Sequence, residues 1–179
     1  HSELKKINDL ENGDNIVKIT DEKEISEIRE IKEYAFYNCS KLSNIHVPSI
    51  AVWCGLTFPT EKANIISSGK NLYVNGELQT AVTIPEGVKT LKKNTFAGYT
   101  ELVSISLPST VSTIEAGAFA SCANVAMYDV HPDNKWYCDV DGVIYNKAKT
   151  ALVLYPSFKS DERYTVEGTV TEISQYAFY

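Results

Sequence analysis

The segment Asp129-Val130-His131-Pro132-Asp133 places three possible metal ligands at alternate positions. Carboxylate oxygens and imidazole nitrogens both bind divalent cations, so this spacing raises the question of a metal site. The nearby Asp139-Val140-Asp141-Gly142 begins like a calcium-binding loop, but the third ligand and the later Glu of such a loop do not follow. An Asp-Gly pair between strand-forming residues is typical of a β-hairpin turn. We therefore interpret the second segment as a turn and the first as its approach, and we expect no metal and no cofactor.

Histidine is the side chain that most often acts as a general base near neutral pH. The chain has three histidines, His1, His46 and His131, and none of them lies near a Ser or Cys in a nucleophile motif. His46 falls at an outward position of a predicted strand, where contact with solvent or a ligand explains it better than proton transfer. The sequence therefore predicts a protein that is not an enzyme.

The elements that carry these residues repeat with a fixed period. Ile84-Pro85-x-x-Val88-x-x-Leu91-x-x-x-Thr95-Phe96 is followed by Leu107-Pro108-x-x-Val111-x-x-Ile114-x-x-x-Ala118-Phe119, and each position advances by 23 residues. Parts of the same pattern surround Phe36 and Phe178. A period in the twenties is typical of a solenoid, in which each unit buries its apolar side chains against its neighbours. We predict a curved, β-rich solenoid of about six or seven coils with little helix.

Each unit contains a short predicted strand. Leu102-x-x-Ile105-x-Leu107-Pro108 alternates apolar and polar residues and then stops at a proline, which lacks the N–H that a ladder needs. The predicted core consists of apolar side chains at the repeated positions, namely Ile84, Leu91, Phe96, Leu102, Ile105, Leu107, Val111, Ile114, Phe119, Cys122, Val166 and Phe178.

Two intervals break the period alike. From Phe36 to Phe96, and again from Phe119 to Phe178, the spacing exceeds two periods by about a dozen residues. Turn signals lie in both, Asn75-Gly76 in the first and Asp141-Gly142 in the second, so we predict two β-hairpins inserted into the solenoid. Cross-strand packing explains the aromatic residues gathered there better than stacking on a carbohydrate does. These residues are Tyr73, Trp136, Tyr137, Tyr145 and Tyr155.

Four cysteines fall into two kinds of position. Cys39 and Cys122 each follow an Ala-Phe pair by three residues, so they occupy equivalent sites in different coils. Coils separated by at least two strand spacings lie ~9.6 Å apart, beyond the ~7 Å that a disulfide tolerates. We expect both to be free and buried. Cys54 and Cys138 lie in the two insertions, and whether they pair stays open.

The rest of the chain sets the domain organisation. Residues 1–27 are predicted to form a degraded N-terminal coil or a cap, with a helix before Ile28 as the alternative. Residues 28–179 are the predicted repeat domain, expected to be truncated at its C-terminus because the last unit is incomplete. A net charge of −6 argues against a nucleic-acid-binding surface. No apolar run approaches the ~20 residues of a membrane-spanning helix.

The phrase Leu102-x-x-Ile105-x-Leu107-Pro108-x-x-Val111-x-x-Ile114-x-x-x-Ala118-Phe119-x-x-Cys122 resembles the repeat of BspA-like leucine-rich-repeat proteins. Residues 141–147 with 152–156, and residues 52–55 leading into 72–78, are similar to inserts of that family. Departures include Thr95 for the usual Ala and Tyr99 for the usual Cys. The resemblance implies a bacterial cell-surface or secreted, and so extracellular, protein that mediates adhesion to proteins or glycans on host or bacterial surfaces. The alternative is a structural spacer of a larger surface protein that has no ligand of its own.

Alignment of the predicted strands places two rows of side chains on the outward face of the sheet. The first row is His46, Thr83, Ser106, Asp129 and Thr165, and the second is Asn44, Ala81, Ser104, Met127 and Arg163. Repeat proteins commonly bind partners on such extended surfaces, and these rows are small, polar and nearly neutral. The whole first row, with Asn44 and Ser104 from the second, forms the candidate ligand-binding face. The alternative is that these are tolerated residues of a solvated sheet.

Overall fold

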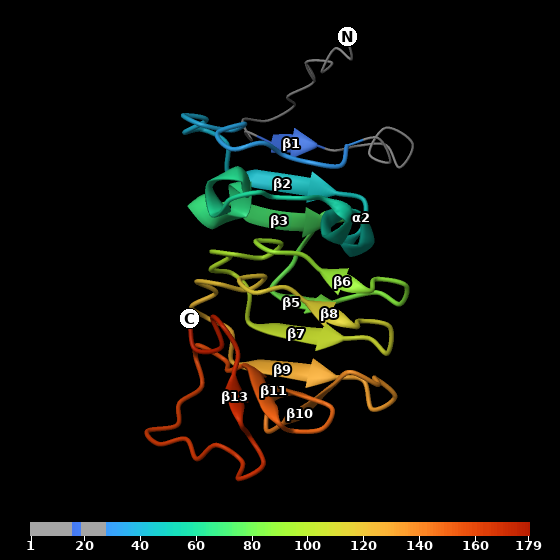
Figure 1. The fold of residues 1–179 in the computed structure, drawn as a ribbon. Helices are drawn as coiled ribbons and strands as arrows, with labels where there is room; N and C mark the ends of the chain where they lie inside the picture. Colours follow the sequence, from blue (N-terminus) through green and yellow to red (C-terminus); the bar gives the residue numbers. More distant parts are fainter. Residues whose placement is uncertain (1–15, 19–27) are drawn as a thin grey trace.

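The computed structural model describes residues 16–18 and 28–179. Its coils stack along one axis into a solenoid of about six turns with a period of about 23 residues, which confirms the predicted fold class (Figure 1). Residues 1–15 and 19–27, and with them most of the predicted N-terminal coil or cap, lie outside the described residues. No helix in the described ranges is long and apolar enough to cross a membrane.

Short strands from successive coils run along one side of the stack (Figure 1). One sheet has the order β1-β2-β3-β4 and a second has the order β5-β7-β9, and neighbours pair in parallel except for the antiparallel pair β3 and β4. A separate pair, β6 and β8, lies elsewhere on the coils. The bounds are β1 Ile16–Lys18, β2 Asn44–Val47, β3 Asn71–Val74, β4 Glu77–Leu78, β5 Ala81–Thr83, β6 Thr90–Leu91, β7 Ser104–Leu107, β8 Thr113–Ile114 and β9 Met127–Val130.

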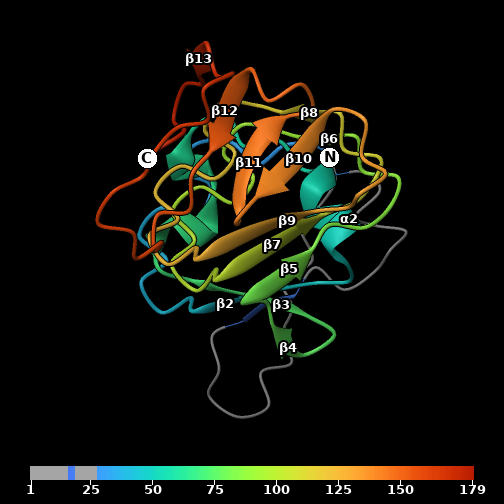
Figure 2. The same cartoon turned by 90° about the horizontal axis from the view of Figure 1, so that it is seen from below.

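The last part of the chain forms a sheet of its own, with the order β10-β11-β12-β13. Its strands are β10 Tyr137–Val140, β11 Val143–Asn146, β12 Ala151–Leu154 and β13 Glu172–Ile173. Figure 2 shows β10, β11 and β12 crossing the direction of β5, β7 and β9 rather than continuing their row. Asp141-Gly142 joins the antiparallel strands β10 and β11, and Asn75-Gly76 joins β3 and β4. Asn75, Gly76, Asp141 and Gly142 all have positive φ, as a tight hairpin turn of this kind requires.

The first insertion differs from the prediction because much of it is helical. It contains the short helix α2, Ile50–Gly55, and the 3-10 helices η1, Glu61–Ala63, and η2, Ile65–Ser68. Ser49 begins α2 by accepting a hydrogen bond from the Val52 N–H at 3.2 Å. The helix buries Ile50, Trp53 and Cys54, which are spaced at i, i+3 and i+4. The sequence contains this spacing, but three apolar residues in so short a segment do not by themselves specify a helix.

Two tyrosine hydroxyls hydrogen-bond to the backbone where the insertions interrupt the ladders. The Leu72 N–H of β3 donates to Tyr99 Oη at 3.2 Å, and the Ile114 N–H of β8 donates to Tyr137 Oη at 3.1 Å. Buried N–H groups are almost always paired, so each hydroxyl does what a backbone carbonyl does in an unbroken stack. This explains Tyr99, which is fully buried, where the repeat usually has a smaller Cys.

Most of the predicted core is buried. Nine of the twelve predicted positions lie in the main cluster of buried side chains, while Ile114 and Val166 are partly buried. Phe178 was predicted wrongly, because its side chain is 54% exposed. It contacts Tyr155 at 4.9 Å between ring centroids, and the neighbouring β13 is the edge strand of its sheet.

Candidate binding surfaces

Two surfaces of the solenoid could contact a partner, and the first is the predicted strand face. Thr83, Ser106 and Asp129 are in-register partners across β5, β7 and β9, and Ser104 lies beside Ala81 and Met127 in the same way. Thr83 and Asp129 are exposed and Ser106 is half-buried. The three strands therefore hold these side chains in two straight rows, as the 23-residue period predicts.

His46 and Asn44 lie on β2, which belongs to the other sheet. Their in-register neighbours are Tyr73 and Asn71 of β3. The imidazole stacks on the Tyr73 ring with centroids 4.8 Å apart and an interplanar angle of 10°, and the Asn71 amide donates to Asn44 Oδ1 at 3.2 Å. Sequence alignment missed both β3 residues because β2 and β3 are 27 residues apart rather than 23.

Thr165 and Arg163 do not extend the rows, which corrects the sequence alignment. Both lie in an irregular segment with no strand assignment. The edge of β9 is instead occupied by the β10–β11 hairpin, since the Tyr128 N–H donates to the Gly142 carbonyl and the Val130 N–H to Asp139 Oδ1, both at 3.0 Å. The strand face therefore ends at Asp129 and Met127.

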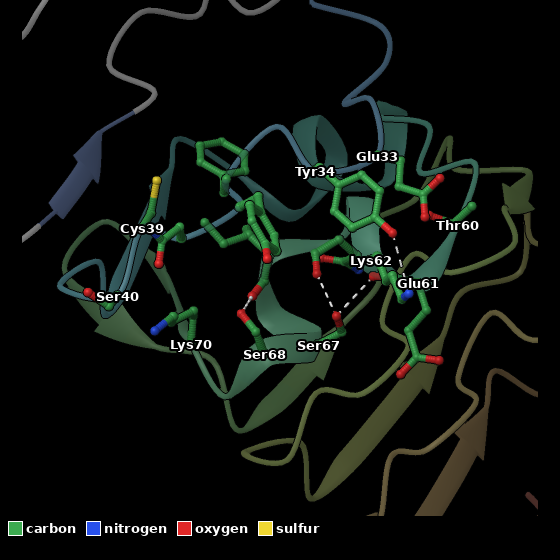
Figure 3. A pocket seen from close by; sticks show the side chains of 15 residues that line it. Glu33, Tyr34, Cys39, Ser40, Thr60, Glu61, Lys62, Ser67, Ser68 and Lys70 are labelled. Atoms are coloured by element: carbon green, nitrogen blue, oxygen red, sulfur yellow. Dashed lines mark hydrogen bonds between the residues drawn. The ribbon is translucent and has the colours of Figure 1, made fainter.

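The second surface is a groove of about 1290 Å³ between residues 33–40 and residues 60–70 (Figure 3). The rings of Tyr34 and Tyr37 meet edge to face on one side, with centroids 5.5 Å apart. Lys62 reaches across, with Nζ 5.6 Å from the centre of the Tyr34 ring and 3.5 Å from its hydroxyl. Nothing in the repeat pattern pointed to this groove.

The histidine and carboxylates that suggested a metal site take part in turn structure. His131 Nδ1 accepts from the Asp133 N–H at 3.2 Å, and Asp139 Oδ1 accepts from β9 as described above. The Asn134 side chain, which is fully buried, makes four hydrogen bonds at the approach to the hairpin. In the part of the chain that the structure describes, no group of three or more His, Cys, Asp or Glu side chains could hold a metal ion.

All four cysteines are free thiols, so Cys54 and Cys138 do not form a disulfide in this structure. Cys122 is buried as predicted and contacts the Phe96 carbonyl at 3.0 Å. Cys39 is free as predicted, but the prediction that it is buried was wrong, because it is exposed at the rim of the groove. No backbone hydrogen bond joins residues 33–40 to residues 60–70 in the described part of the chain, whereas the Gly98 N–H donates to Ala120 O beside Cys122.

The thiols should therefore react with a disulfide reagent in two groups. Burial raises the pKa of Cys54 and of Cys122 to about 12, so both stay protonated at pH 8 as well as inaccessible. We expect Cys39 to react first, Cys138 more slowly, and Cys54 and Cys122 only in denaturant. The number and rate of reacting thiols are measured with Ellman's reagent on the native wild-type protein and on Cys39→Ser. Loss of the fast phase in Cys39→Ser is expected, and its persistence would contradict the exposure of Cys39.

The comparisons with known families fit this architecture. Residues 65–136 match the BspA type leucine-rich repeat region, in six copies. These residues are BspA-type leucine-rich repeats. The resemblance that the apolar phrases predicted is thus confirmed, and the matched segment contains β5, β7 and β9 with both rows of outward side chains. Among curated proteins, no sequence matches the chain.

Three solved structures of bacterial proteins share the fold. A leucine-rich repeat protein from Eubacterium ventriosum has a TM-score of 0.63 at 22% identity, over 92% of this chain and 44% of that protein. The pneumococcal vaccine antigen PcpA has a TM-score of 0.52 at 24% identity, over 84% of this chain and 34% of that protein. A leucine-rich cell surface protein from Faecalibacterium prausnitzii has a TM-score of 0.51 at 23% identity, over 84% of this chain and 49% of that protein. This chain therefore spans about a third to a half of the proteins whose fold it shares.

Proposed function

We propose that this chain is a non-enzymatic repeat module of a bacterial cell-surface or secreted protein and that it binds a protein or glycan partner outside the cell. The BspA-type repeats and the names of two structural neighbours, a cell surface protein and a vaccine antigen, support the location. The observation that carries the binding role is the pair of in-register rows on β5, β7 and β9.

These rows have the properties of a broad contact surface. Thr83, Ser106 and Asp129 are held by parallel strands, so binding would not require their backbone to become ordered. Hydroxyl and carboxylate groups predominate, so a partner would be bound through hydrogen bonds more than through apolar burial. The affinity should depend only weakly on salt. His46, stacked on Tyr73, adds an aromatic pair on the neighbouring sheet. Thr165 is not part of this face.

The double variant Ser106→Arg/Asp129→Arg tests the strand face. Two long cationic side chains on the adjacent strands β7 and β9 would block the close approach of a flat surface. The affinity for a partner captured by the wild-type protein should therefore fall at least about tenfold. Immobilised wild-type protein, screened against extracellular-matrix proteins and glycans, supplies the partner, and surface plasmon resonance measures the change. Lys89→Glu/Lys93→Glu, which changes charge in the opposite sense and away from these strands, is a control for the effect of charge elsewhere on the coils. Unchanged affinity in a folded Ser106/Asp129 double variant would show that this face does not bind the partner.

A spacer is the second candidate, favoured by how the coils are joined. Side chains bond across neighbouring coils at one-period spacing: Glu86 Oε1 accepts from the Ser109 N–H at 3.1 Å, and the Gly87 N–H donates to Thr110 Oγ1 at 3.0 Å. Such contacts stiffen a rod that holds other domains apart. A screen in which the folded protein captures no matrix protein and no glycan would favour the spacer.

A further inference from the structure

The groove beside residues 33–40 exists because the first insertion separates two coils. In the regular part of the stack, equivalent turns are joined directly, since the Phe96 N–H donates to Ala118 O at 2.9 Å and the Gly98 N–H to Ala120 O at 2.7 Å. No such backbone bond joins residues 33–40 to residues 60–70 in the described part of the chain. Phe36, the counterpart of Phe96, is accordingly only half-buried.

The two walls are nevertheless fixed relative to each other. On one side of the opening the Ile31 N–H donates to Thr57 O at 3.0 Å, and on the other side β2 and β3 pair along four residues. The floor includes buried Asn64, whose amide donates to Asn94 O at 2.6 Å and to Thr95 O at 3.0 Å. The groove is thus a preformed opening between coils that are bonded at both ends, which is typical of ligand sites.

The lining combines exposed aromatic rings with hydroxyl, amide and charged groups. Tyr37 is 76% exposed and Tyr34 is 52% exposed, and the charges balance as two glutamates against two lysines. Thr60 Oγ1, at the edge of the groove, is buried and has almost no solvent contact, so the exposed rings and polar groups are what a ligand would meet (Figure 3).

We propose that this groove binds a neutral oligosaccharide. The C–H faces of a sugar ring pack on tyrosine rings, while its hydroxyls exchange hydrogen bonds with carboxylate, amide and hydroxyl groups, and all of these line the groove. Balanced charge gives no preference for a sulfated or sialylated glycan. The inference rests on the proposed binding function but uses a different surface, so its failure would leave the strand-face test intact.

An extended peptide fits the groove less well. Strand addition needs a row of unpaired N–H and C=O groups, whereas these walls are turns and 3-10 helices bonded within themselves. The Tyr37 N–H donates to Tyr34 O at 2.9 Å, and the Ser67 N–H donates to Asn64 O at 3.2 Å. Recognition in the groove therefore depends on side chains, in particular on the two tyrosine rings.

Saturation-transfer NMR and calorimetry with three neutral tetrasaccharides, cellotetraose, chitotetraose and mannotetraose, test the proposal. At least one should bind the wild-type protein at millimolar concentration or below. Tyr37→Ala should weaken that binding about threefold to tenfold, the effect of losing one stacked ring. Tyr179→Ala, which removes another exposed tyrosine outside the groove, is the matched control and should leave binding unchanged.

Binding of none of the three sugars would overturn the proposal, and so would equal affinity in wild type and Tyr37→Ala. Selection of peptides from a displayed library that require Tyr37, with no sugar bound, would also overturn it and would assign the groove to a protein partner.

Discussion

Replacing Phe119 with alanine should lower the free energy of unfolding by about 3–5 kcal/mol. The side chain is 3% exposed and stacks on Phe96, with ring centroids 5.5 Å apart and an interplanar angle of 1°. It also meets the Tyr128 ring edge to face at 5.7 Å. The coils cannot close around the cavity, because backbone hydrogen bonds fix the spacing between the coils of Phe96 and Phe119. Urea unfolding followed by circular dichroism measures the loss.

Phe178→Ala is the matched control, since it makes the same change at the equivalent repeat position. Its side chain is 54% exposed, so we expect a loss below about 1 kcal/mol. A loss below that value for Phe119→Ala would mean that the repeat frame is wrong. Equal, large losses for both variants would mean that Phe178 is buried in solution.

The regular coils could be predicted because their information is local and repeated. Each strand is specified by alternation and a terminal proline within one unit, and the adjacent unit repeats it, so Ile105 and Val82 become partners without further input. The rows on β5, β7 and β9 follow from the same period. Thr83, Ser106 and Asp129 could therefore be placed together from the sequence.

The features that the sequence did not reveal depend on contacts between distant segments. The helix α2 is held by Trp53 Nε1, which donates to Thr95 O at 2.9 Å, and by Lys92 Nζ, which donates to Gly55 O at 2.6 Å. The strand rows end at Asp129 because a hairpin turn packs on β9, and periodicity carries no information about where an inserted turn lies. The groove arises likewise from a missing contact between coils.

Cross-coil contacts of single polar side chains were equally hidden, and Asn134 is the strongest case. Its amide donates to Pro108 O at 2.8 Å and to Val111 O at 2.9 Å, while its Oδ1 accepts from the N–H groups of Trp136 and Tyr137, both at 2.9 Å. With no exposed surface, this one side chain joins the preceding coil to the start of β10. The sequence showed only an Asn in a loop.

Asn134→Ala should lower the free energy of unfolding by at least about 3 kcal/mol, because each buried group left without a partner costs roughly 1–3 kcal/mol. The hairpin should also loosen from β9, so hydrogen exchange of the Tyr128 amide, which donates to Gly142 O, should become faster. Asn124→Ala is the control: that amide is exposed and makes one cross-coil bond, to Thr100 O at 2.7 Å, so a loss below about 1 kcal/mol is expected. If the two variants lose equal stability and the Tyr128 amide keeps its protection, Asn134 does not hold the second insertion to the solenoid.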